Sequence, residues 1–139
     1  MGALSAWQGL FVHGRMQPGE RVLVTGASGG VGHLAVQLAR QAGAEAVDEG
    51  PAQLVFDTVG GDLPEGDRVV TIAAEVPGAT YFVVEPDREQ LVELARLADA
   101  GDLVPAIDST FSLERAGEAF DRVAAHGKRG KVVLDVAGG

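Results

Sequence analysis

The order of apolar and polar residues divides the chain into amphipathic helices and short apolar strands. Apolar residues recur at helical spacing over 3–13, 31–42, 87–100 and 113–125. Runs rich in apolar and β-branched residues predict strands at 22–24, 54–56, 68–73, 79–84 and 131–136, and 104–113 is predicted to be extended. Strands that alternate with helices and short glycine turns are typical of an α/β fold with a mainly parallel sheet flanked by helices.

A glycine-rich turn joins the strand at 22–24 to the following helix. Residues 27–32, Ala-Ser-Gly-Gly-Val-Gly, fit the dinucleotide fingerprint with alanine in the first glycine position. Gly29 would let the backbone approach a pyrophosphate, Gly32 would let the helix pack on the strand, and the helix N-terminus would face the phosphates. We therefore predict a phosphate-binding turn. The alternative is a tight turn that binds nothing. A Walker-type loop is excluded because no Lys-Ser or Lys-Thr follows the glycines.

Ligands of parallel sheets bind past the carboxyl ends of the strands, and here these ends include residues 57–61 and 72–75. For Asp57 we prefer a turn-capping role to general acid/base catalysis. Tyr81 is interpreted as a core aromatic residue, with proton donation as the alternative. Trp7 is interpreted as a packing residue, with ligand contact as the alternative.

The remaining polar candidates are scattered. His13, His33 and His126 have no metal-site spacing, so no metal site is predicted. His33 either touches a phosphate or faces water. Lys128, Arg129 and Lys131 form a basic turn that we expect to be solvated, and no catalytic residue is assigned.

Composition narrows the classes of partner. The chain has 139 residues, 46% of them hydrophobic but only 5% aromatic, so its core must be built mainly from Ala, Val and Leu. A net charge of −9 disfavours non-specific binding to nucleic acids or anionic membranes. We expect no membrane span and no signal peptide. The lack of cysteine excludes disulfides and thiolate metal sites and is compatible with a cytoplasmic location.

Five segments together resemble the medium-chain dehydrogenase/reductase superfamily, and within it the zinc-independent quinone oxidoreductases and enoyl reductases. They are ALSAWQGLF, PGERVLVTGASGGVGHLAVQLARQAGA, LVFDTVGG, GDRVVTIA and FSLERAGEAFDRVAAHGKRGKVVLDV. The resemblance covers nearly the whole chain. It implies a shortened Rossmann-like domain over 1–139 that binds NADP(H), with NAD(H) as the alternative. The implied cofactor-binding residues are Ala27, Ser28, Gly29, Gly30, Val31, Gly32, Val59, Gly60, Ile72, Ala73, Phe82 and Val84.

The sequence departs from this family in three places. No substrate-binding β domain precedes the helix at Ala3. About twenty residues after Gly43-Ala44 are lacking, including the strand end that reads the adenosine ribose, and 45–50 is too short for a βα unit. The helix between 61 and 68 is reduced to a loop. The segment 107–139 would pack partly on the absent domain, so we expect exposed apolar surface and a homodimer.

Asp48 lies where an acidic residue would bond the ribose 2′-hydroxyl, but the family match puts it after the deletion, so we prefer solvated surface. No Lys or Arg lies between Arg40 and Arg68 to clamp a 2′-phosphate. The resemblance favours an NAD(P)H-dependent hydride transfer to a quinone or enone-type substrate. The alternatives are a nucleotide-binding module without chemistry and a repurposed scaffold for a cofactor-free cyclisation or isomerisation.

Overall fold

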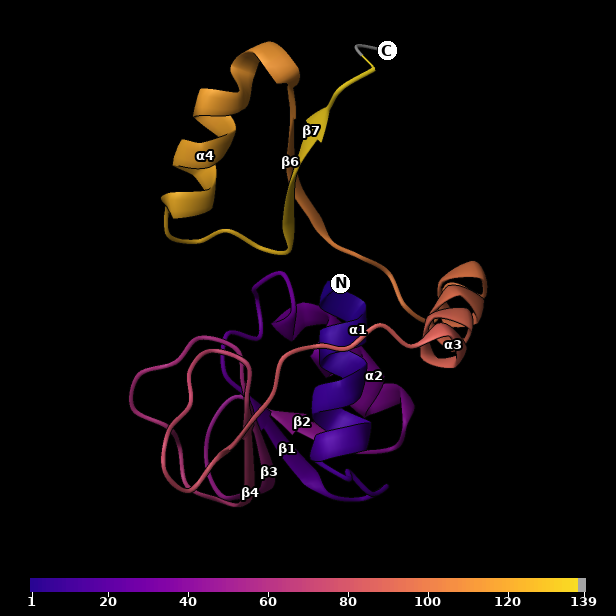
Figure 1. Cartoon of the computed structure of the whole chain (residues 1–139), viewed down its shortest axis with the longest axis vertical. Coiled ribbons are helices and arrows are strands. Elements are labelled where there is room, and N and C mark those ends of the chain that lie inside the picture. Colours follow the sequence, from indigo (N-terminus) through magenta and orange to yellow (C-terminus); the bar gives the residue numbers. More distant parts are fainter. Residues whose placement is uncertain (138–139) are drawn as a thin grey trace.

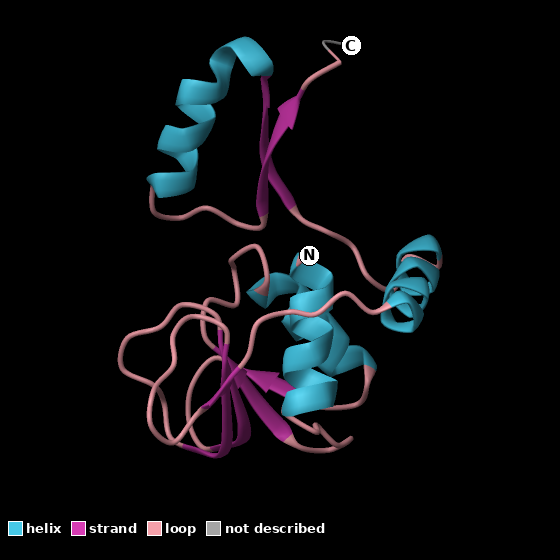
Figure 2. Ribbon diagram, viewed as in Figure 1, coloured by secondary structure: helices cyan, strands magenta, loops and turns pink. Residues whose placement is uncertain are grey.

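A computed structural model describes residues 1–137 and shows a parallel sheet with helices packed on one face (Figures 1 and 2). Within these residues five parallel strands form this main sheet, in the order β2-β1-β3-β4-β5. The strands are β1 (Arg21–Val24), β2 (Glu45–Val47), β3 (Ala52–Asp57), β4 (Gly66–Thr71) and β5 (Thr80–Tyr81). The predicted α/β, Rossmann-like class with a mainly parallel sheet is confirmed.

The helices predicted at 3–13, 31–42 and 87–100 form, and their apolar faces join the core on one face of the main sheet. Helix α1 (Gly2–Trp7) continues into the π-helical turn η1 (Gln8–His13), and α2 (Gly32–Gln41) and α3 (Arg88–Asp99) follow. Leu10, Leu38 and Leu97 pack in one cluster with Val22 and Phe56 of the sheet. The Asp87 side chain caps α3 by accepting a 2.9 Å hydrogen bond from the Gln90 amide. The core is therefore built where the apolar periodicity predicts it.

The other face of the main sheet carries Leu23, Val55 and Ala52, with Val47 and Val69 packed against them. Here the connections between parallel strands are short. Residues 48–51 join β2 to β3, and 58–65 and 72–79 join the next strand pairs without a helix. Parallel strands are usually joined by a dozen or more residues, most often with a helix. The shortened crossovers therefore leave this face to loops.

The segment after Gly43-Ala44 differs from the expectation. Glu45–Val47 is β2 and pairs in parallel with β1, with Arg21 opposite Glu45 and Leu23 opposite Val47. The prediction that the strand end beside the ribose site is lacking is therefore wrong. Three residues suffice for β2 because it is an edge strand and forms backbone hydrogen bonds with β1 alone.

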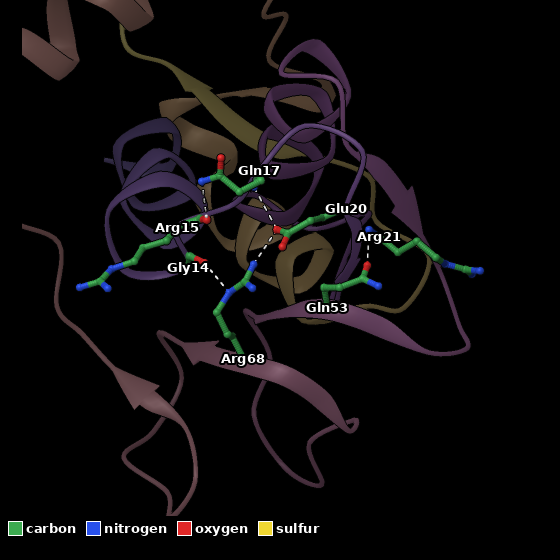
Figure 3. Close-up of polar contacts among 7 residues, drawn as sticks. All are labelled: Gly14, Arg15, Gln17, Glu20, Arg21, Gln53 and Arg68. Atoms are coloured by element: carbon green, nitrogen blue, oxygen red, sulfur yellow. Dashed lines mark hydrogen bonds and ion pairs between the residues drawn. The ribbon is translucent and has the colours of Figure 1, made fainter.

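Polar contacts tie the amino ends of the strands to the turn before β1 (Figure 3). The Arg68 guanidinium donates a 2.9 Å hydrogen bond to the Gly14 carbonyl and forms a 2.6 Å ion pair with Glu20. The Glu20 carboxylate also accepts from the Gln17 amide, at 2.9 Å. The hydrogen bond from Arg68, followed by that from the Gln17 amide, lowers the pKa of Glu20 below its usual value. This cluster fixes β4 against the end of η1.

Residues 107–135 form a second body, named here the C-terminal unit, which stands off the main sheet in Figures 1 and 2. It contains β6 (Ile107–Ser112), the 3₁₀ turn η2 (Leu113–Arg115), α4 (Ala116–Ala124) and β7 (Lys131–Asp135), and β6 pairs in parallel with β7. The Arg122 guanidinium binds both oxygens of Asp108 at 2.6 Å, which joins α4 to β6. This bidentate contact and the other hydrogen bonds to Asp108 lower the pKa of its carboxyl group.

The C-terminal unit buries less apolar surface than the helical pattern predicts. The helical spacing over 113–125 predicts a buried face that includes Ala119, Phe120 and Val123. Ala119 is buried, but Phe120 is 72% exposed and Val123 is half exposed, so this prediction is wrong for both. Ile107, Leu113 and Val136 are also exposed. Two strands and one helix offer too little surface to cover both faces of the helix–sheet pair. Gly138 and Gly139 lie outside the described residues.

Candidate functional site

The turn between β1 and α2 has the close packing that its glycines predict. Gly26 adopts a φ of +67°, and a Cβ atom there would lie 2.6 Å from Cγ2 of Val59. A Cβ atom on Gly32 would overlap the Gly26 carbonyl oxygen. The Gly29 amide donates a 2.8 Å hydrogen bond to that same carbonyl. The first turn of α2 is therefore pressed against the end of β1.

The same turn presents free donors at the start of α2. Among the hydrogen bonds within residues 1–137, the amides of Gly30 and Val31 have no protein acceptor. They lie at the N-terminus of a ten-residue helix, where unpaired amides and the helix dipole favour an anion. Residues 26–32 therefore fit a phosphate-bearing ligand.

Asp57 connects the carboxyl ends of three neighbouring strands. Its side chain is 1% exposed and accepts hydrogen bonds from the hydroxyls of Thr25, at 2.5 Å, and Thr71, at 2.6 Å. It also accepts from the amides of Val59 and Gly60, at 3.2 and 3.0 Å. Burial alone would raise the pKa of Asp57, but these hydrogen bonds outweigh it and lower the pKa. The turn-capping interpretation is confirmed, because all of these contacts hold the turn in place.

Most of the predicted cofactor-binding residues gather at this edge. Val59 is exposed beside Gly26, and a Cβ atom on Gly60 would lie 3.2 Å from the Cβ of Ala73. The Ile72 amide donates a 3.1 Å hydrogen bond to the Asp57 carbonyl oxygen. The contact of these residues with a cofactor stays a prediction, as it does for residues 27–32.

Phe82 and Val84 differ from this group because their side chains pack into the core. The Phe82 ring is 6% exposed and stacks on His13, with ring centroids 4.3 Å apart, and on Phe56 at 6.5 Å. Val84 packs at the border of the core. The side chain of Phe82 therefore supports the sheet from within. Tyr81 is 40% exposed, so its interpretation as a core residue is wrong. Trp7 packs against Phe11 and the core, as predicted.

A hollow of about 1160 Å³ extends from the glycine turn across the loop-covered face of the main sheet. It is lined at one end by the turn residues Ala27 and Ser28 and by Asp48 and Glu49, which directly follow β2. The opposite end is lined by Glu65 and Asp67. Asp48 thus lies at the carboxyl end of the strand beside β1, which places it closer to the turn than the family match indicates.

The C-terminal unit and the segment that leads into it contact the glycine turn and the start of α2. The Gly130 amide donates a 2.8 Å hydrogen bond to the Ser28 carbonyl. Lys131 is half-buried, and a Cβ atom on Gly30 would lie 2.6 Å from its Nζ atom, so the expectation that this lysine is solvated is wrong. His33 binds two backbone groups, the Gly29 carbonyl and the Ala106 amide. A cation and two hydrogen bonds therefore flank the turn.

Sequence reasoning missed the roles of Thr25, Thr71 and Lys131. Thr25 and Thr71 could have been found, since they and Asp57 each stand at the carboxyl end of one of three adjacent strands. Lys131 gave no such signal, because its contact depends on how the C-terminal unit docks.

Within residues 1–137 no three His, Cys, Asp or Glu side chains gather in the way that a metal site requires. In the same part of the chain no helix has the length and apolar character needed to cross a membrane.

Comparison with known proteins agrees with this geometry. The family model described as zinc-binding dehydrogenase matches residues 30–134. A probable zinc-binding oxidoreductase, mitochondrial, from Arthroderma benhamiae is 28% identical, over 98% of this chain and 60% of its own length. An acryloyl-coenzyme A reductase from Sulfurisphaera tokodaii is 28% identical, over 92% of this chain and 54% of its own length. The chain thus spans somewhat more than half the length of these curated relatives.

Solved structures show the same relationship. The quinone oxidoreductase of Coxiella burnetii superposes with a TM-score of 0.85 at 25% identity, covering 98% of this chain and 58% of that one.

The alignment to the Arthroderma protein runs over 199 positions, more than the 139 residues of this chain, so internal segments of that relative have no counterpart here. The chain belongs to the zinc-binding dehydrogenase family, and its fold is that of the cofactor-binding domain of medium-chain dehydrogenases/reductases.

Proposed function

We propose that the chain binds a nicotinamide dinucleotide at the carboxyl edge of the main sheet and serves as the cofactor domain of an oxidoreductase. The observation that carries this proposal is the pair of free amides of Gly30 and Val31 at the start of α2, in a turn too tight for side chains at Gly26 and Gly32. Lys131 supports it, because its ammonium group lies beside Gly30 on the side of the C-terminal unit.

Different groups of the chain would contact different parts of the dinucleotide. The amides of Gly30 and Val31 would hold the pyrophosphate, and the edge formed by Val59, Gly60 and Ala73 would support the rest of the ligand. The dinucleotide, when bound, supplies the hydride. Asp57 would keep the turn at 58–60 in register with β1 and β4 through its hydrogen bonds to Thr25 and Thr71. For substrate, we propose a quinone or an enone-type acceptor, and the acryloyl-coenzyme A reductase relative supports the latter.

For the choice of dinucleotide, the structure favours NAD(H), although the family resemblance implies NADP(H). Asp48 and Glu49 border the hollow beside the turn, and a 2′-phosphate placed between them would meet two like charges. Titration of the chain with NADH and NADPH, followed by nicotinamide fluorescence, compares the two affinities. We expect Asp48→Asn to tighten NADPH binding by about fivefold. Asp67→Asn, on the far rim of the same hollow, is the matched control and should leave the ratio unchanged.

Two further variants test whether the glycine turn at 26–32 binds the dinucleotide. A Cβ atom on Gly29 would lie 3.1 Å from the Gly26 carbonyl oxygen, so Gly29→Val should abolish dinucleotide binding while circular dichroism shows a folded domain. Gly117→Ala, at an open position of α4, is the control. The absence of binding at millimolar dinucleotide would contradict both nucleotide-binding functions and leave the cofactor-free scaffold.

Steady-state reduction of quinones and of enoyl thioesters then separates an active oxidoreductase domain from a binding module without chemistry. Hydride transfer needs donor and acceptor held close together and shielded from water. The exposed edge at Val59 does not provide this shielding within the described residues, so we expect slow turnover. A homodimer and a cytoplasmic location stay predictions.

A further inference from the structure

His33 bridges the glycine turn and the segment that leads into the C-terminal unit. Its Nδ1 atom lies 2.6 Å from the Gly29 carbonyl oxygen, and its Nε2 atom lies 3.0 Å from the Ala106 amide nitrogen. A carbonyl only accepts and a backbone N–H only donates, so Nδ1 carries the proton and Nε2 accepts. Both ring nitrogens are therefore engaged, which neither a phosphate contact nor a solvated histidine explains.

Other polar contacts cross the same boundary. The Gly130 amide donates to the Ser28 carbonyl at 2.8 Å. The Gln37 side chain accepts from the Val104 amide at 2.8 Å and donates to the Val104 carbonyl at 3.0 Å. The Lys131 amide donates to the Ala106 carbonyl at 2.8 Å, which joins the segment that leads into the unit to β7. The glycine turn is therefore linked to the C-terminal unit twice, through His33 and the Ala106 segment and directly through Gly130.

Within residues 1–137, β6, α4 and β7 pack mainly on one another, and Figures 1 and 2 show the unit standing off the main sheet. Its placement therefore depends on the contacts at the turn and along α2. Such a small polar interface is weak enough to open locally without unfolding the core.

The hydrogen bonds act on the groups that would hold a phosphate. The Gly29 carbonyl and the Gly30 amide belong to one planar peptide group, so fixing the oxygen fixes the direction of the free N–H. The Ser28 carbonyl and the Gly29 amide are linked in the same way. The His33 backbone amide also donates to the Gly29 carbonyl, at 3.2 Å, so the ring reinforces a contact that the helix already makes. His33 and the C-terminal unit thus hold two successive peptide planes of the turn.

We propose that His33 is a positioning residue that couples the glycine turn to the docking of the C-terminal unit. The part of this proposal that concerns a bound dinucleotide rests on the function proposed above. A docked unit pre-orients the Gly30 amide, and a dinucleotide bound at that amide favours the docked unit in return, because coupling between two sites is reciprocal.

Two substitutions separate the two bonds of the ring. His33→Asn places an amide nitrogen at the level of Nδ1, so it keeps a donor for Gly29 and loses the acceptor for Ala106. His33→Gln places an oxygen at the level of Nε2, so it keeps the acceptor and loses the donor. Gln41→Ala, at the exposed end of α2, is the control.

The first measurement is hydrogen–deuterium exchange without nucleotide. We expect His33→Asn to speed exchange about fivefold at the Ala106 amide and also at the Gly130 amide, which His33 does not touch. His33→Gln should restore protection at both, and Gln41→Ala should match the wild type. Faster exchange at Ala106 alone would show an isolated hydrogen bond and overturn the proposal.

The second measurement adds NADH. We expect it to slow exchange at Ala106 and Gly130 in the wild type, and we expect both His33 variants to bind it about fivefold more weakly. Unchanged affinity in both variants would overturn the coupling to ligand. A wild-type chain that binds neither dinucleotide would overturn the proposed function instead, and the exchange rates without nucleotide would still decide whether the turn and the unit are coupled.

Discussion

The hydroxyl of Thr71 donates a 2.6 Å hydrogen bond to Oδ2 of the buried Asp57 and so joins the carboxyl ends of β4 and β3. Asp57 is ionised and has no cationic partner among these contacts, which come from hydroxyl and amide groups. A buried charge held only by neutral donors is costly to disturb, since each lost donor leaves part of the charge uncompensated.

We expect Asp57→Asn to lower the free energy of unfolding by about 2–4 kcal/mol at neutral pH, because the amide offers one acceptor oxygen where the carboxylate offers two. Since the pKa of Asp57 is lowered on folding, its contribution is present above the ordinary aspartate pKa of about 3.9 and is lost as the pH falls through the lower folded value. Urea unfolding between pH 7 and pH 3 measures both effects. The control is Asp62→Asn on the exposed turn, and equal stability of the two variants would contradict this role.

The glycines at 32 and 117 should respond to alanine in opposite ways. A Cβ atom on Gly32 would overlap the Gly26 carbonyl oxygen, so Gly32→Ala should destabilise the fold by about 1–3 kcal/mol and weaken dinucleotide binding. Gly117 lies in α4 with open space around it, so Gly117→Ala should stabilise the helix by about 0.5–1 kcal/mol. Thermal unfolding of both variants checks the pair. A stabilised Gly32→Ala variant would show that the turn relaxes freely.

Glu20→Gln should lower the free energy of unfolding by about 1 kcal/mol, because the amide weakens the contacts with Arg68 and Gln17. This value is discounted for solvent screening, since the Arg68 side chain is 36% exposed. The pKa of Glu20 is lowered, so the contribution is present above the ordinary glutamate pKa of about 4.3 and is lost as the pH falls below it. In denaturant titrations, Glu93→Gln in the exposed pair with Arg96 should show no measurable change.

Self-association should depend on the exposed apolar residues of the C-terminal unit. If a homodimer covers Phe120 and Val123, sedimentation velocity will show a concentration-dependent dimer that Phe120→Gln weakens about tenfold or more. Phe120 is 72% exposed, so the substitution should leave the fold stable. Val92→Gln on the outer side of α3 is the control. A monomer at high concentration would contradict the prediction.

The sequence predicts the fold well wherever one periodicity dominates. The helices α2 and α3 and the strands β1, β3 and β4 lie where apolar spacing places them, because each packs against a continuous core. β2 was harder to predict, since three residues carry too little pattern. Phe120 was placed wrongly because helical periodicity shows which residues share a face and does not show whether anything covers that face.

The candidate site was predictable in part for a similar reason. The turn at 26–32 is a local motif, so its order along the chain was enough to locate it. The positions of His33, Asp48 and Lys131 depend on distant partners, namely the Ala106 segment, the short crossover after β2 and the docked C-terminal unit. Contacts between segments far apart in sequence leave no local pattern to read.

The four-residue crossover at 48–51 also bears on how the chain folds. It joins β2 to β3 directly, so fewer residues separate the paired residues Val22 and Leu54 of β1 and β3 than a helical crossover after β2 would leave between them. Halving the length of a loop lowers its closure cost by about 0.6 kcal/mol, and low sequence separation between contacts speeds folding. The main sheet should therefore assemble faster than that of a relative in which a full helical crossover joins β2 to β3.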